Sequence, residues 1–164
     1  MALAQAQAER FTQTGRLAAA FFFSRSDASR DKLDQFIVTV GQPLVTSSTL
    51  RPLLATLIDR AIRSTPGIWE KNWENQFKVI IQEPCAQVNL KRWGHLPRLV
   101  IIDGLDECID VASQKRLLDT IKASTTLSLN FSIFSRPEPH ITRIFRQDSF
   151  VPAPRVISVG DFPV

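Results

Sequence analysis

The sequence predicts an α/β fold: a three-layer sandwich in which helices cover both faces of a mostly parallel sheet. Two observations carry this prediction. Short runs of consecutive apolar residues alternate along the chain with segments whose apolar residues have helical spacing, and two of these runs lead directly into charged or acidic residues. Continuous apolar runs are typical of strands buried on both faces, as in parallel sheets. The 164 residues suffice for one domain with its own core.

The first quarter of the chain predicts a helix, a strand and a second helix. Residues 2–14 contain many good helix formers, and Gly15 supplies a natural stop. The apolar run from Leu17 to Phe23 favours a strand, with a continuing helix as the competing interpretation. Residues 33–40 are expected to form a short helix that ends near residues 41–43.

The middle of the chain predicts two amphipathic helices. The first has apolar residues at three- and four-residue steps between positions 50 and 62, and Ser48 or Thr49 can cap it. The second opens at residues 65–66 and is weakened or ended by Pro84. Its apolar stripe, which we expect to be core, consists of Trp69, Trp73, Phe77, Ile80 and Ile81.

The second half of the chain predicts three further strands, at Leu99 to Ile102, Phe131 to Ser135 and Arg155 to Val159. Asp110 can cap a helix between the first two, and residues 141–145 suggest one or two helical turns after the next strand. The inner face of the helix after Asp110 is expected to contain Leu117, Leu118 and Ile121.

Composition excludes several classes of function. The net charge of +4 arises from scattered basic residues rather than from a stripe, which argues against a nucleic-acid partner. No apolar run approaches the roughly 20 residues that cross a bilayer, and the first ten residues do not resemble a signal peptide, so we expect a cytoplasmic protein without a membrane anchor. Two cysteines and two histidines make a zinc site an unfavourable interpretation.

Three carboxylates follow the strand predicted at residues 99–102. The end of a parallel strand lies at the sheet edge where ligands of open α/β folds bind. Asp103 there is suited to holding a magnesium ion together with nucleotide oxygens, and Asp106 or Glu107 can orient an attacking water for phosphoryl transfer. The competing interpretation is a structural turn, because Asp-Gly pairs are common in turns; three mutually repelling acids favour function.

A second polar pair, Ser135 and Arg136, follows the strand predicted at residues 131–135. If the two strands are neighbours, Arg136 lies beside the acidic cluster, where a guanidinium can contact the terminal phosphate of a nucleotide. The alternative is that Arg136 pairs with Glu138, or with the carboxylate of Asp106 or Glu107, and only holds the structure together. Spacing alone does not separate these two interpretations.

At these residues the chain resembles the NACHT group of P-loop NTPases in the STAND class, and the fungal NACHT proteins most of all. Residues 99–107 are similar to the family's Walker B strand with its acidic pair, residues 135–141 to its sensor segment, and residues 17–25 to its second strand. The resemblance implies an ATP- or GTP-dependent signal-transduction switch that self-associates or binds protein partners. It assigns Asp103 to Mg²⁺, Asp106 and Glu107 to the acidic pair, and Ser135 with Arg136 to the sensor.

The chain departs from the family in one respect that matters for mechanism. It contains no G-x-x-x-x-G-K-[ST] segment, the Walker A loop that in the family precedes the helix resembled by residues 1–14. We therefore expect residues 1–164 to form a partial NACHT domain, with an incomplete P-loop NTPase fold and a vacant position in the sheet, that binds no cofactor and hydrolyses little or nothing alone. Two alternatives are a working switch whose P-loop comes from elsewhere and a nucleotide-independent protein interaction module.

Overall fold

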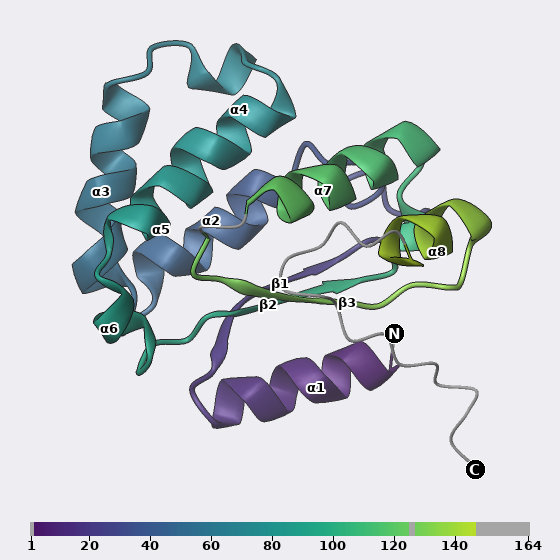
Figure 1. Ribbon diagram of the computed structural model, residues 1–164, viewed down its shortest axis with the longest axis horizontal. Coiled ribbons are helices and arrows are strands. Elements are labelled where there is room, and N and C mark those ends of the chain that lie inside the picture. The colour runs from purple at the N-terminus through teal and green to yellow at the C-terminus, as the bar shows by residue number, and fades with distance from the viewer. Residues whose placement is uncertain (1, 125–126, 147–164) are drawn as a thin grey trace.

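The computed structural model describes residues 2–124 and 127–146 of the chain and confirms an α/β fold (Figure 1). Its sheet has three parallel strands in the order β1 (Leu17–Phe22), β2 (Leu99–Asp103), β3 (Asn130–Ile133), with β2 in the centre. The predicted positions of these strands are confirmed, although β3 ends two residues earlier than expected. The strand predicted at Arg155 to Val159 lies outside the described residues.

Helices cover both faces of the sheet, as a three-layer sandwich requires. Of the helices within the described residues, α1 (Ala2–Gln13) is the one that covers the lower face of the sheet in Figure 1. Its small buried residues Ala4 and Ala8 pack with Ile101 of the central strand. The chain then turns at Gly15, which has φ +65°, and enters β1. Because α1 runs back along β1, its N-terminus lies at the edge where the strands end (Figure 1).

The other face carries most of the helices and the main core. Apolar side chains from these helices pack with Phe21, Val100 and Ile102 of the sheet. The helical elements that follow β1 within the described residues are α2 (Phe36–Thr46), α3 (Arg51–Arg63), the short turn η1 (Ile68–Glu70), α4 (Trp73–Phe77), the π-helical turn η2 (Lys78–Gln82), α5 (Glu83–Gln87), α6 (Leu90–Trp93), η3 (Leu105–Glu107), α7 (Val111–Ala123) and α8 (Pro139–Arg146). None of the helices in the described ranges has the length and hydropathy needed to cross a bilayer.

Helix α2 corrects one prediction. It begins at Phe36 rather than at Leu33, and it continues through Pro43 to Thr46 instead of ending near Gly41. A proline inside a helix costs about 3 kcal/mol. Full burial of a large apolar side chain contributes about 1.5–3 kcal/mol. Helix α2 buries four such residues completely, so burial outweighs the proline; they are Phe36, Ile37, Val40 and Leu44.

The helix predicted to open at residues 65–66 begins later, and its predicted apolar stripe is partly wrong. Helix α4 starts at Trp73, where the side chain of Asn72 accepts a hydrogen bond from the Asn75 N–H at 2.9 Å. Trp69 lies in the preceding turn and is 53% exposed rather than part of the core. Pro84 does not end the helix. The π-helical turn η2 directly before it is wider than an α-helical turn, and this local irregularity lets the helix continue through the proline.

Two helix starts differ in how well the sequence predicted their caps. For α3 the prediction of Ser48 or Thr49 is wrong: the N-cap is Leu50, and the Oγ of Ser47 accepts the Leu50 N–H at 3.1 Å. For α7 the prediction is confirmed, because Asp110 accepts the Ser113 N–H at 2.6 Å. The expected inner face of α7 is also confirmed; Leu117 and Leu118 are buried, and Ile121 packs against the core.

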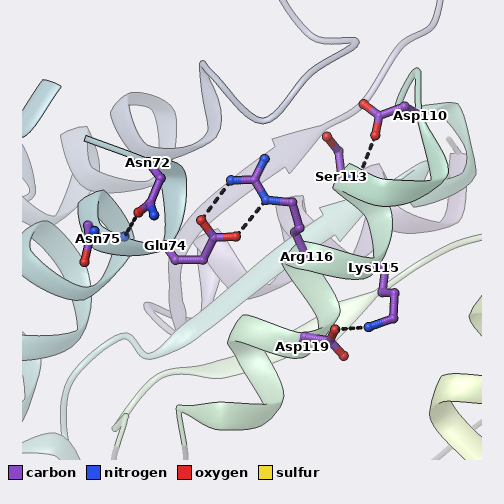
Figure 2. A network of polar contacts seen from close by, with 8 residues as sticks. All are labelled: Asn72, Glu74, Asn75, Asp110, Ser113, Lys115, Arg116 and Asp119. Carbon is purple, nitrogen blue, oxygen red and sulfur yellow. Dashed lines mark hydrogen bonds and ion pairs between the residues drawn. The ribbon is translucent and has the colours of Figure 1, made fainter. Parts of the chain in front are cut away.

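Helices α4 and α7 are joined by an ion pair that spans 42 positions of sequence (Figure 2). Arg116 Nε and Nη2 donate to the two carboxylate oxygens of Glu74 at 2.7 and 2.8 Å. These hydrogen bonds lower the pKa of Glu74 and raise that of Arg116. Two parallel hydrogen bonds fix the relative orientation of the two side chains as well as their separation, so this pair orients α7 relative to α4.

Candidate functional site

The three strands end at one edge of the sheet, and the backbone continues to pair just beyond them. The Phe23 N–H donates to the Asp103 carbonyl at 2.9 Å, and the Phe134 N–H donates to the Ile102 carbonyl at 2.8 Å. Asp103 itself ends β2 opposite Phe22 and is only 5% exposed. The segments that follow β1, β2 and β3 are therefore held side by side.

The segment after β2, residues Gly104–Cys108, is a compact turn that we call the acidic turn. Gly104 has φ +69°, and a Cβ on it would lie 3.2 Å from the Phe23 carbonyl oxygen, so the turn requires glycine. The Glu107 N–H donates to the Gly104 carbonyl at 2.7 Å, and the Cys108 N–H to the Leu105 carbonyl at 3.2 Å. Because Leu105 and Cys108 are completely buried, the turn is anchored in the core.

Asp106 brings the acidic turn into contact with the segment after β3. Its Oδ1 accepts the Arg136 N–H at 3.0 Å and the Ser135 hydroxyl at 3.3 Å. Its Oδ2 lies 3.7 Å from Arg136 Nε. The expected proximity of Arg136 to the acidic cluster is therefore present. Of the alternatives open at sequence level, the described structure contains the pairing of Arg136 with Asp106.

Glu107 faces the opposite neighbour, the segment after β1. Its Oε2 accepts the Arg25 N–H at 3.3 Å, and the Arg25 guanidinium donates to the Asp106 carbonyl at 2.9 Å. Sequence reasoning did not assign a role to Arg25. The available signal was its position directly after an apolar run, the same position that drew attention to Ser135 and Arg136. The acidic turn is thus held by one arginine on each side.

Two titratable groups, one at the end of the acidic turn and one directly after it, have pKa values that differ from their ordinary ones. Burial raises the pKa of the Cys108 thiol to about 11. Hydrogen bonds from Ser113, the backbone one foremost, lower the pKa of Asp110. Only a thiolate is an effective nucleophile, so Cys108 is a packing residue near neutral pH.

The oxygen donors of this edge suit one kind of cation site. Among the described residues, no three His, Cys, Asp or Glu side chains are grouped so that they could hold a metal ion by themselves. Mg²⁺, however, is commonly held by one or two carboxylates together with phosphate oxygens and waters. The carboxylates of Asp103, Asp106 and Glu107 are donors of the type that Mg²⁺ prefers, and any cation here would need further oxygen ligands from outside the described residues.

Comparison with known proteins identifies a family. The family model described as "Nephrocystin 3, N-terminal" matches residues 2–136, from α1 to the segment after β3. The matched range includes all the residues of the candidate site. No curated protein and no solved structure matches the chain. Domains of this family are associated in general with NACHT-containing proteins. The chain therefore belongs to the nephrocystin 3 N-terminal family.

Proposed function

We propose that this chain provides the Walker B and sensor segments of a NACHT-type, nucleotide-dependent signalling switch, similar to those of fungi. One observation supports this proposal most: the acids that follow β2 contact the Ser135–Arg136 pair that follows β3, at the carboxyl edge of a parallel sheet. Ligands of open α/β folds bind at this edge. The N-terminus of α1 lies at the same edge, and helix N-termini favour phosphate groups (Figure 1).

Each residue of the site has a role in this proposal. Asp103 is the carboxylate that shares a Mg²⁺ with nucleotide phosphates, and that ion would neutralise charge on the phosphate oxygens. Asp106 and Glu107 orient the water that attacks the terminal phosphate. Ser135 and Arg136 contact that phosphate and change partner when it is lost. The nucleotide is ATP or GTP.

The contact between Arg136 and Asp106 is weak enough to be exchanged for a phosphate. The Arg136 side chain is 82% exposed, and its Nε lies 3.7 Å from the carboxylate. Exposed ion pairs contribute about 0–1 kcal/mol. Arginine–phosphate contacts are often bidentate and are among the strong hydrogen bonds. We therefore propose that Arg136 exchanges its contact with Asp106 for a contact with the terminal phosphate when a nucleotide binds.

Residues 1–164 alone are proposed to be inactive as an NTPase, because the sequence lacks the G-x-x-x-x-G-K-[ST] loop whose N–H groups and lysine hold the phosphates. Hydrogen bonds to charged groups contribute about 1.5–3 kcal/mol each. Isothermal titration calorimetry with Mg²⁺ and ATP or GTP should therefore show no binding. Micromolar binding that disappears in Asp103→Ala would contradict this part of the proposal.

A second candidate is a protein interaction module that works without nucleotide. It is favoured because both Asp106 and Glu107 accept hydrogen bonds from the protein itself, as the acids of a purely structural turn would. Self-association, measured by sedimentation, separates the candidates through the variant Asp103→Asn/Asp106→Asn/Glu107→Gln. The interaction module predicts association without nucleotide that is unchanged in this variant, whereas the switch predicts that residues 1–164, which bind no nucleotide, do not associate.

A further inference from the structure

We infer that His140 and Gln114 are positioning residues, which join the start of α8 to the end of the acidic turn through a partly buried hydrogen-bond chain. The functional meaning of this link, as a pivot for the sensor segment, rests on the proposed function. The link itself does not, because it is made entirely of contacts within the protein.

Gln114 is the centre of the chain. It lies in the first turn of α7 and is only 4% exposed. Its Nε2 donates to the carbonyl oxygen of Cys108 at 2.9 Å, and its Oε1 lies 2.5 Å from His140 Nε2. A carbonyl oxygen can only accept, so the amide nitrogen must face Cys108. The amide oxygen then faces the imidazole, and His140 Nε2 must carry the proton.

The two ends of this chain belong to the candidate site. Cys108 closes the acidic turn through its N–H bond to Leu105. His140 is the second residue of α8, four positions after Arg136. The acidic turn and the segment after β3 are therefore joined twice: directly through Asp106, and indirectly through Gln114 and His140.

The two connections differ in burial, and this difference defines their roles. The direct one involves an arginine side chain that is 82% exposed, whereas the indirect one passes through a buried amide. A buried polar group that loses its partner costs more than an exposed one, because water does not replace the bond. When Arg136 exchanges Asp106 for a phosphate, the link through the buried Gln114 remains and keeps the start of α8 in place against the acidic turn. Residues 135–139 then move about a fixed point.

The first test uses the unmodified chain. The ¹⁵N chemical shifts of the neutral His140 ring report which nitrogen carries the proton. The inference predicts the Nε2–H tautomer. A spectrum of the Nδ1–H tautomer would overturn it, since Nε2 could then not donate to Gln114.

The second test asks whether the link acts on the acidic turn. In His140→Ala, amide hydrogen exchange at Glu107 and Cys108 should become about tenfold faster, the effect expected when a hydrogen bond worth about 1.4 kcal/mol is lost. His140→Gln, which retains an N–H donor, should restore much of the protection. Arg143→Ala, an exposed change on the same helix, is the control and should leave the turn unchanged.

Faster exchange confined to α8 in His140→Ala, or equal effects of His140→Ala and Arg143→Ala on the turn, would show that His140 only stabilises its own helix. These measurements need no nucleotide. Self-association that survives Asp103→Asn/Asp106→Asn/Glu107→Gln, together with an intact response of the turn, would therefore contradict the proposed function alone. The reverse result would contradict only the positioning role.

Discussion

The segments that follow β2 and β3 are neighbours, but the first is firmly fixed by buried contacts, whereas the second carries an exposed side chain. The acidic turn after β2 is fixed by a left-handed glycine, two internal hydrogen bonds and the completely buried side chains of Leu105 and Cys108. The segment after β3 presents Arg136 with its side chain 82% exposed, whereas that of Asp106 is 12% exposed. The acids are thus preorganised and the arginine is free to reorient. Such a division suits a site in which the acids hold a ligand and the arginine responds to it.

The largest effect should come from changing the glycine that shapes the acidic turn. Gly104→Ala places a Cβ 3.2 Å from the Phe23 carbonyl on a backbone at φ +69°, and should lower the free energy of unfolding by about 2 kcal/mol. Two glycines serve as controls in urea denaturation. Gly15→Ala has the same left-handed backbone with open space around it and should cost less; Gly94→Ala, with ordinary φ, should cost least. Equal losses for Gly104→Ala and Gly94→Ala would mean that the turn is not fixed as described.

Asp110, which follows the acidic turn and caps α7, should give the next largest effect. Asp110→Ala should cost about 1 kcal/mol near neutral pH, the usual value of an N-cap. Because the folded-state pKa of Asp110 is lowered, its contribution is present above the ordinary value of 3.8 and is lost as pH falls through the folded-state pKa. The free energies of unfolding of the two proteins, measured by chemical denaturation, should therefore converge as the pH falls below 3.8. A loss that is independent of pH would exclude an ionised cap.

The Asp106–Arg136 contact should contribute little to stability. A double-mutant cycle with Asp106→Ala and Arg136→Ala should give a coupling energy of at most about 0.5 kcal/mol, as exposed ion pairs do. Arg136→Ala alone should be nearly neutral, whereas Asp106→Ala should cost somewhat more because it also frees the Ser135 hydroxyl and the Arg136 N–H. A coupling energy above 2 kcal/mol would make Arg136 a structural residue and remove the contrast between the two segments.

The smallest expected effect concerns the reactivity of the two buried cysteine thiols. Burial raises the pKa of Cys108 to about 11 and that of Cys85 to about 12, so neither thiol should react with iodoacetamide at about pH 8 in the folded protein. Both should react in denaturant. Rapid labelling of Cys108 alone under native conditions would show that the acidic turn opens, contrary to its fixed character.

The sequence predicted the sheet better than the helices that cover it. Runs of consecutive apolar residues such as Leu99 to Ile102 identify buried strands. Because neighbouring parallel strands end at the same edge of a sheet, the strand ends also place Asp103 and Arg136 at one edge. Local proline rules did not predict that the chain stays helical through Pro43 and Pro84. Burial of the flanking side chains outweighs the proline in α2, and the π-helical turn η2 precedes the proline in α5.

Within the site, residue types and spacing predicted the acids and the arginine but not their contacts. That Arg136 pairs with Asp106, rather than with Glu138, depends on the fold of the acidic turn, and that Arg25 contacts Glu107 depends on strand order. The hydrogen-bond chain of Gln114 and His140 was equally hidden, since its residues are separated by 26 positions and lie on different helices. The cytoplasmic location and the protein partners remain predictions.

The most direct test of the proposed switch is a gain of binding. A strand and Walker A loop fused before Ala2 would add the missing phosphate contacts to the N-terminus of α1, and calorimetry of this fusion should show Mg²⁺-dependent binding of ATP or GTP. Binding should be lost in Asp103→Asn, weakened in Arg136→Ala, and retained in Asp119→Asn, an acid outside the site that pairs with Lys115 (Figure 2). A fusion that folds with native helix content yet binds no nucleotide, or binds it equally well without Asp103, would contradict the account.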